Sequence, residues 1–192
     1  MVPAIDDTAR IVDSTVGAAE IREYVTVHRG TPKDRGITTI GDGCFLMVYS
    51  HVAHDCDVGN QVVMANAVNL AGHVVLGDHV NIGGMTAVHQ FARVGRMAFV
   101  GGASAVSLDV PPFSSAAGNR AKLYGLNSVG LKRSGMDKAD VHAVRRAYRA
   151  LFQKGASQEE ALAELRASED ANVAPVAELI EFVAASERGG VR

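Results

Sequence analysis

The sequence has little that would cross-link the chain, insert it into a membrane or give it a strong charge. Only two cysteines, Cys44 and Cys56, occur in 192 residues, which excludes a framework of several disulfides. No apolar run approaches the ~20 residues that a membrane-spanning helix needs. A net charge of −2 gives no electrostatic reason to expect binding of nucleic acid or an anionic membrane surface. Because the N-terminus also lacks the pattern of a signal peptide, we expect a cytoplasmic protein.

Aromatic residues are also scarce, at 5% of the chain, and tryptophan is absent. Glycine is abundant, with 20 residues, and hydrophobic residues make up 47%. This hydrophobic content excludes a disordered chain. Many small residues and few rings favour a core built from narrow, regular layers.

An internal repeat of six residues determines the expected fold. The fifth place of each hexad holds no residue larger than valine, and glycine recurs at the second place. This period fits neither an α-helix nor a hairpin meander, but it is typical of a parallel β-helix in which three hexads make one triangular coil. The first place is always aliphatic or methionine: Ile40, Leu46, Val52, Val58, Met64, Leu70, Leu76, Ile82, Val88, Val94, Val100 and Val106.

The repeat divides the chain into three predicted parts. Residues 1–112 form the β-helix, with about four regular coils after one imperfect coil and an excursion loop at about 31–39. Residues 113–136 form a linker. Residues 137–192 form a small α-helical domain that covers the open end of the β-helix, which would otherwise be an unpaired sheet edge.

Helical spacing predicts three helices in the last part. The first begins near Asp137 and ends at Gly155. The second begins with Ser157 and Glu160, which have the spacing of a capping box. The third covers about residues 174–187.

The 18-residue coil brings together groups that can perform acid–base chemistry. His54 should lie beside Gly72, and Asp55 beside His73. An imidazole can take a proton from a hydroxyl, a carboxylate can orient it, and a glycine N–H can hold an oxyanion. These are the groups that acyl transfer to an alcohol needs. Two other readings of the spacing remain open: His51, His54 and His73 as metal ligands, or imidazoles that only face solvent.

Three other groups of residues have simpler interpretations. Cys44 and Cys56 fit as small wall residues rather than reactive thiols. His79 and His142 are expected to face solvent. The six-residue period does not give the hand of the coil, since the general rule favours right-handed crossovers.

Several longer stretches resemble the UDP-N-acetylglucosamine O-acyltransferases, which start lipid A synthesis. The run from Met85 to Phe91 is far more specific than the hexad pattern. The likeness extends from about Glu20 to the C-terminus. It is carried by residues 21–30, 51–56, 70–73, 82–91, 109–112 and 130–133.

The resemblance implies a left-handed parallel β-helix and a homotrimer with active sites between subunits. It implies transfer of an (R)-3-hydroxyacyl group from acyl carrier protein to the 3-hydroxyl of UDP-N-acetylglucosamine, without a metal or organic cofactor. His54 would be the general base, Asp55 its orienting partner and Gly72 the oxyanion donor. His28, His51, His73, His89 and Gln90 would line the substrate site, Asn127 and Arg133 would hold the nucleotide, and Gly102 would leave the acyl slot open to longer chains.

The chain also departs from the family pattern. It looks shortened at the N-terminus by roughly four coils, counting ~18 residues per coil, and lacks a substrate-binding loop there. Val129, Arg120 and Ser134 replace an acid, a histidine and an arginine. These changes keep two alternatives open: a non-catalytic binding protein that joins mixed trimers, and a variant that acylates an amino group. The sister N-acyltransferase of the pathway is disfavoured by the stretch from Ala87 to Phe91.

Overall fold

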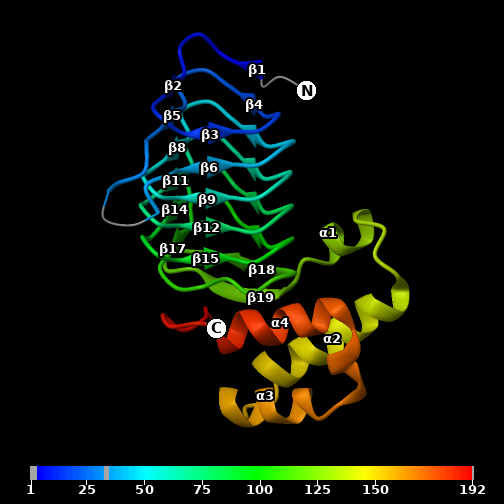
Figure 1. Cartoon of the computed structure of the whole chain (residues 1–192). Helices are drawn as coiled ribbons and strands as arrows, with labels where there is room; N and C mark the ends of the chain where they lie inside the picture. Colours follow the sequence, from blue (N-terminus) through cyan, green and yellow to red (C-terminus); the bar gives the residue numbers. More distant parts are fainter. Residues whose placement is uncertain (1–3, 33–34, 192) are drawn as a thin grey trace.

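The computed structural model describes residues 4–32 and 35–191 of the chain. It is a parallel β-helix with a helical domain against its C-terminal end, as Figure 1 shows. Three sheets form the faces of a triangular prism, and each strand of the coils pairs in parallel with the strand one coil away. We call the eight-, six- and five-stranded sheets A, B and C.

Nearly every strand has only two residues, of which the second points into the prism. In sheet A the order is β1 (Ala4–Ile5), β4 (Glu20–Ile21), β7 (Phe45–Leu46), β10 (Val63–Met64), β13 (Asn81–Ile82), β16 (Phe99–Val100), β18 (Ser114–Ala117) and β19 (Lys122–Leu126). In sheet B it is β17 (Ala105–Val106), β14 (Ala87–Val88), β11 (Asn69–Leu70), β8 (His51–Val52), β5 (Thr26–Val27) and β2 (Arg10–Ile11). In sheet C it is β15 (Arg93–Val94), β12 (Val75–Leu76), β9 (Asp57–Val58), β6 (Thr39–Ile40) and β3 (Thr15–Val16).

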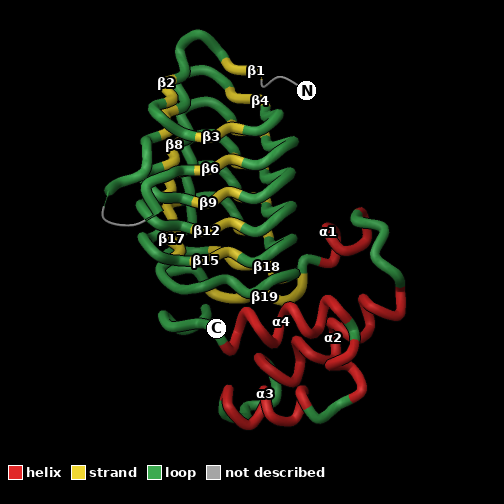
Figure 2. The backbone as a smooth tube through the Cα atoms, in the orientation of Figure 1, coloured by secondary structure: helices red, strands yellow, loops and turns green. Residues whose placement is uncertain are grey.

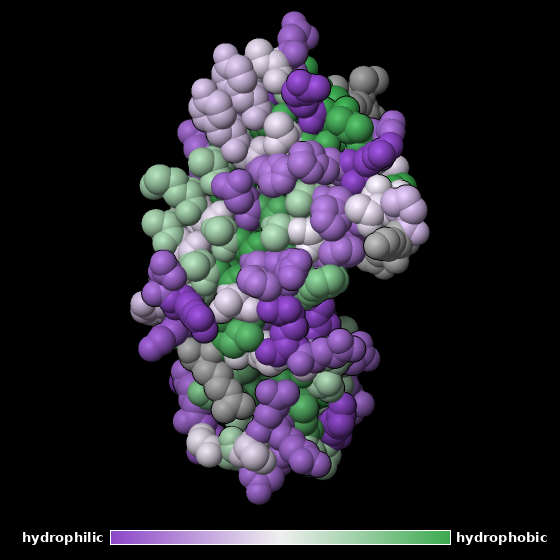
Figure 3. All heavy atoms as spheres, turned by 90° about the vertical axis from the view of Figure 1, so that its left-hand side faces the viewer, coloured by the Kyte–Doolittle hydropathy of each residue, from purple (hydrophilic) through white to green (hydrophobic). Residues whose placement is uncertain are grey.

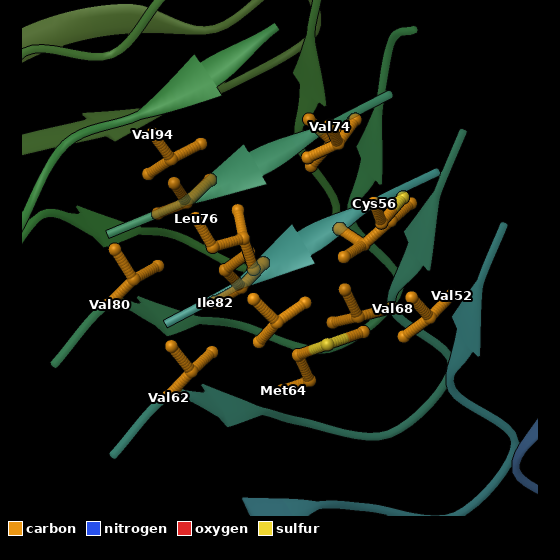
Figure 4. Close-up of a cluster of buried hydrophobic side chains, with 14 of the residues drawn as sticks. Val52, Cys56, Val62, Met64, Val68, Val74, Leu76, Val80, Ile82 and Val94 are labelled. Atoms are coloured by element: carbon orange, nitrogen blue, oxygen red, sulfur yellow. The ribbon is translucent and has the colours of Figure 1, made fainter. Parts of the chain in front are cut away.

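The aliphatic hexad positions fill the prism interior, as the repeat predicts. In successive coils, Leu70 pairs with Val52 and Val88, 18 residues away on either side. The small fifth-place residues, such as Val62 and Val74, are also fully buried. Figure 4 shows these side chains stacked in layers between the three walls. Because each layer has nearly the same volume, no bulky ring is needed inside.

Most turns at the prism corners contain a residue in the left-handed backbone region. We name each corner by the sheets it joins. Corner BC, which follows the strands of sheet B, includes Asp55 (φ 59°), His73 (φ 62°) and Phe91 (φ 62°). A non-glycine residue in this region costs roughly 1–2 kcal/mol.

The N-terminal stretch is more regular than the sequence suggested. One imperfect coil was expected before residue 28, but β1 to β5 all lie there. The expectation missed Val16, which fills the interior after a step of five residues from Ile11, with five more to Ile21. Two short steps therefore absorb the apparent slip in register. The excursion loop separates β5 from β6, and its residues 33 and 34 lie outside the described residues.

The predicted linker at 113–136 is instead structured. Strands β18 and β19 form an antiparallel hairpin on the last coil, followed by helix α1 (Ser128–Arg133). The hairpin gives the final edge of sheet A a partner. Figure 2 shows the longer strand β19 beneath the last coil, with α1 to one side.

Four further elements make the helical domain. Helix α2 (Lys138–Phe152) begins next to Asp137, as expected, and the Asp137 side chain caps it. The predicted capping box of Ser157 and Glu160 begins α3 (Gln158–Arg166). The 3₁₀ helix η1 (Glu169–Asn172) leads to α4 (Ala174–Ala184), which ends before the expected residue 187. After α4 the chain turns back to the solenoid, where the backbone of Asp109 forms hydrogen bonds with Gly189 and Val191.

The helices and the last coil share a second core. Phe113 of the solenoid and Leu131 of α1 are buried with residues of α2, α3 and α4. Two ion pairs, Arg93 with Asp109 and Arg96 with Glu178, accompany this junction. Among the described residues, no helix is long and apolar enough to cross a bilayer.

Candidate functional site

His54 lies on corner BC with one ring nitrogen facing a buried carboxylate. Its Nδ1 is 3.0 Å from Oδ2 of Asp55, whose side chain is 0% exposed, whereas the His54 side chain is 42% exposed. A carboxylate at Nδ1 favours the tautomer with the proton on that nitrogen. The other nitrogen, Nε2, is then left with its lone pair, as a general base requires.

Asp55 is held by the excursion loop as well as by His54. The Thr31 N–H lies 3.0 Å from each carboxylate oxygen, the Thr31 hydroxyl donates to Oδ2 at 2.7 Å, and the Gly36 N–H donates to Oδ1 at 3.1 Å. The Asp55 N–H in turn donates to the buried Thr38 hydroxyl at 2.9 Å. Burial raises the pKa of Asp55, but the hydrogen bonds from Thr31, His54 and Gly36 outweigh it and lower the pKa to about 2.

Gly72 lies beneath the His54 ring, one coil further on. A Cβ at residue 72 would be 2.6 Å from Cε1 and 2.7 Å from Nε2 of His54. The imidazole therefore occupies space that only glycine leaves free. The Gly72 N–H has no backbone acceptor among the described residues. The same is true of the equivalent N–H groups one coil away, those of His54 and Gln90. The neighbours that the register predicts for His54 are therefore in place.

Rings continue along corner BC from His54. His73 meets His54 edge-on at 5.0 Å between ring centroids, and Phe91 stacks on His73 at 4.4 Å. Ligand atoms of His54, Asp55 and His73 lie within 4.8 Å of one another, which is close enough for a metal ion. However, Asp55 already accepts hydrogen bonds from three groups, so this geometry suits a held imidazole better than a metal site.

A second histidine pair lies nearer the N-terminal end of sheet B. His28 and His51 meet edge-on at 4.7 Å, and the Thr26 hydroxyl lies 2.7 Å from His51 Nδ1. Burial and the nearby His28 both lower the pKa of His51, which favours its neutral form. A neutral imidazole can exchange hydrogen bonds with a sugar without adding charge. Figure 3 shows this side of the molecule, where hydrophilic and hydrophobic residues are intermixed.

His89 and Gln90 follow β14, one coil beyond Gly72. His89 is exposed, and its Nδ1 is 3.0 Å from the Gln90 carbonyl oxygen and 3.2 Å from Nη2 of Arg188. The structure thus places His28, His51, His54, Gly72, His73, His89 and Gln90 on sheet B or its edge at corner BC.

The remaining predicted site residues lie at other corners. Asn127 and Arg133 line a cavity of about 640 Å³ near corner CA, together with His79 and Arg96. Asn127 also caps α1 by accepting from the Gly130 N–H, and donates to the Met97 carbonyl. Gly102 lies at corner AB, where a Cβ would approach the Gly84 carbonyl oxygen to 3.2 Å. One copy of the chain therefore does not bring His54, the pair Asn127 and Arg133, and Gly102 together.

The two cysteines belong to the buried core of the solenoid. Both are buried, and each thiol donates to a backbone carbonyl of the next coil. Burial raises the pKa of Cys44, and raises that of Cys56 to about 11, so neither is a thiolate near neutral pH. His79 and His142 are both exposed, as expected, and His79 also lines the cavity near Asn127.

Sequence reasoning missed four residues near these sites: Thr31, Phe91, His79 and Arg188. The 18-residue register could have placed Phe91 on His73, since 73 and 91 differ by one coil. It could not have placed Thr31, because the excursion loop interrupts the register before Asp55. Arg188 reaches His89 from the chain that follows α4, which no local pattern connects to sheet B.

Comparison with known proteins finds relatives that carry the same enzyme name. Residues 109–191 match the family model described as UDP-N-acetylglucosamine O-acyltransferase, domain 2. An acyl-[acyl-carrier-protein]–UDP-N-acetylglucosamine O-acyltransferase of Burkholderia orbicola is 48% identical over 90% of this chain and 67% of its own length. One from Aliivibrio fischeri is 46% identical over 90% of this chain and 65% of its own. The chain thus spans about two thirds of the length of these relatives.

Solved structures agree. A UDP-N-acetylglucosamine O-acyltransferase of Moraxella catarrhalis has a TM-score of 0.89 and 45% identity, covering 93% of this chain and 70% of the other. A UDP-N-acetylglucosamine acyltransferase from Campylobacter jejuni has a TM-score of 0.80 and 30% identity, covering 99% of this chain and 98% of the other.

Proposed function

Because the chain belongs to the UDP-N-acetylglucosamine O-acyltransferase family and has its left-handed parallel β-helix, we propose that it is an acyltransferase of lipid A synthesis. It moves an (R)-3-hydroxyacyl group from acyl carrier protein to the 3-hydroxyl of UDP-N-acetylglucosamine. The observation that carries the proposal is the contact of His54 Nδ1 with Asp55 above Gly72. The reaction would occur in the cytoplasm.

The chemistry follows from the three groups on corner BC. His54 Nε2 takes the proton of the acceptor hydroxyl as its oxygen bonds to the thioester carbonyl carbon. The carbonyl oxygen becomes an oxyanion, which the Gly72 N–H stabilises. The C–S bond then breaks, and His54 returns the proton to the departing thiolate. Asp55 stabilises the imidazolium that exists between these two transfers.

Other groups on the same wall would hold the substrates. His28, His51, His73, His89 and Gln90 offer polar contacts along sheet B. Asn127 and Arg133 would hold the nucleotide from their separate cavity, and Gly102 would admit a longer acyl chain at corner AB.

This division of the site supports a homotrimer. The base lies at corner BC, the nucleotide residues near corner CA and Gly102 at corner AB. Threefold packing would place different corners of neighbouring copies against each other, and a cleft between two walls can enclose a lipid chain. Corner AB also exposes apolar side chains that a neighbouring copy could cover. Tyr24 stacks on Tyr49 at 5.1 Å between ring centroids, and Met85 is 72% exposed.

Turnover by the purified chain tests the proposal. The assay would combine UDP-N-acetylglucosamine with a series of (R)-3-hydroxyacyl carrier-protein thioesters and detect the acylated sugar nucleotide by mass spectrometry. We expect ester formation that requires both substrates. Ligand binding without turnover would favour the non-catalytic alternative. Turnover only with a 3-amino analogue of the acceptor would identify an amide-forming variant.

A further inference from the structure

A basic groove lies at the C-terminal end of sheet B, outside the contacts of His54. Its volume is about 910 Å³, and its charged lining groups are Arg120, Lys122 and Arg188, with His89 at one side. No carboxylate is among the described lining residues. In contrast, the cavity near Asn127 contains Asp137 and Asp140, which offset its arginines.

The three cations come from two separate segments. Arg120 and Lys122 lie at the turn and start of the β18–β19 hairpin, and Arg188 follows α4. Within the described part of the chain, none of the three forms an ion pair. Like charges gathered without partners repel one another, so the folded groove has a net attraction for an anion.

Arg188 in particular lacks good partners. Its Nε is buried with no hydrogen-bond acceptor among the described residues, and its Nη2 is 3.4 Å from the Ser107 carbonyl oxygen. Its other contact, His89 Nδ1, also faces the Gln90 carbonyl oxygen. If Nδ1 carries a proton, it can donate to the Gln90 carbonyl but cannot accept from Arg188. If Nδ1 carries no proton, it can accept from Arg188 but leaves the Gln90 carbonyl without this donor. An anion that accepts from Arg188 would remove this conflict.

We propose that the basic groove binds a phosphate-ester group of one of the two substrates through Arg120, Lys122 and Arg188. Arginine and lysine are the usual partners of phosphate oxygens, and an Asn119 amide in the same lining can add a hydrogen bond. The inference rests on the proposed function, under which both substrates carry such a group: the diphosphate of the sugar nucleotide and the phosphate of the donor's phosphopantetheine arm. Contact with His89 places the groove beside the expected substrate wall.

Equilibrium binding by calorimetry tests this assignment. The probes are UDP-N-acetylglucosamine and 4′-phosphopantetheine, each at low and moderate salt. The variant Arg120→Gln/Lys122→Gln removes two exposed charges, and Lys122→Gln alone provides a milder change. Arg145→Gln/Arg149→Gln is the matched control, because it removes two exposed charges from α2.

We expect the groove double variant to bind one of the two probes about tenfold more weakly, the scale of one charge-assisted hydrogen bond, with a smaller salt dependence. The probe that loses affinity identifies the phosphate that the groove holds. Unchanged affinity for both probes, or equal losses in the control, would overturn the site. A wild-type chain that binds neither probe would also overturn the site. The proposed function is tested separately by turnover, so these outcomes can be told apart.

Discussion

Thr31 holds both carboxylate oxygens of Asp55, although 24 residues separate them. Its N–H lies 3.0 Å from each oxygen, and its hydroxyl donates to Oδ2 at 2.7 Å. The same Oδ2 faces His54. The excursion loop thereby fixes the carboxylate that faces His54, so under the proposed function Thr31 would act as a positioning residue.

Replacing Thr31 by valine removes the hydroxyl and keeps the shape of the side chain. We expect kcat to fall about tenfold with KM nearly unchanged, because a loosely held carboxylate orients His54 less well. Thr31→Ser should restore most of the rate. Steady-state kinetics normalised to folded protein checks this. If both variants lost stability equally and kept the wild-type kcat, the role of Thr31 would be structural only.

The low pKa of Asp55 predicts an acid-sensitive contribution to stability. A carboxyl whose pKa is about 2 in the folded protein and near 3.8 when unfolded stabilises the fold above about pH 5. That stability is lost as the pH falls through 4 toward 2, and it amounts to about 2 kcal/mol. Urea unfolding of the wild type and Asp55→Asn at several pH values isolates it. Parallel curves for the two proteins below pH 5 would contradict this assignment.

Gly72→Ala tests the position of the imidazole. The added Cβ would lie 2.6 Å from a His54 ring atom, and since the ring is partly exposed it can rotate away without unfolding the chain. We expect kcat to fall about hundredfold with little loss of stability. Gly190→Ala is the control, because its Cβ would meet only an ordinary contact at 3.6 Å. Near-normal kcat in Gly72→Ala would show that the base does not need this placement.

Asp109 joins the solenoid to the helical domain. Its side chain is 1% exposed and accepts from Nε and Nη2 of Arg93 and from the Ser186 hydroxyl. We expect Asp109→Ala to cost about 3 kcal/mol, since it leaves a partly buried guanidinium unpaired. Arg146→Ala, which breaks the more exposed pair with Asp170, should cost at most about 1 kcal/mol. Urea titration compares them, and similar costs would refute the special role of Asp109.

The sequence predicted the repeating part of the fold because each coil depends on the same local rule. An aliphatic residue at every sixth position and an 18-residue register sufficed to place His54 beside Gly72. The six-residue spacing made no correct prediction where the chain departs from the hexad repeat. Val16 fills the interior after a five-residue step, and the hairpin of β18 and β19 ends the coil without a hexad signal.

The site was predictable only where it follows the coil. The partners of Asp55 in the excursion loop and the contact of Arg188 with His89 depend on how irregular segments fold back, which spacing does not encode. The roles expected of Asn127, Arg133 and Gly102 came only from the resemblance to a known family. Their separation on different corners emerged only from the three-dimensional structure.

The most direct measurement of the central claim is the rate of acyl transfer by His54→Ala. With saturating UDP-N-acetylglucosamine and a hydroxyacyl carrier-protein thioester, we predict that kcat falls about 10³-fold, as expected when a general base is removed. Binding of the sugar nucleotide should change little, because His54 acts mainly in the transition state. Transfer that survived near the wild-type rate would contradict the assignment of His54 as the catalytic base.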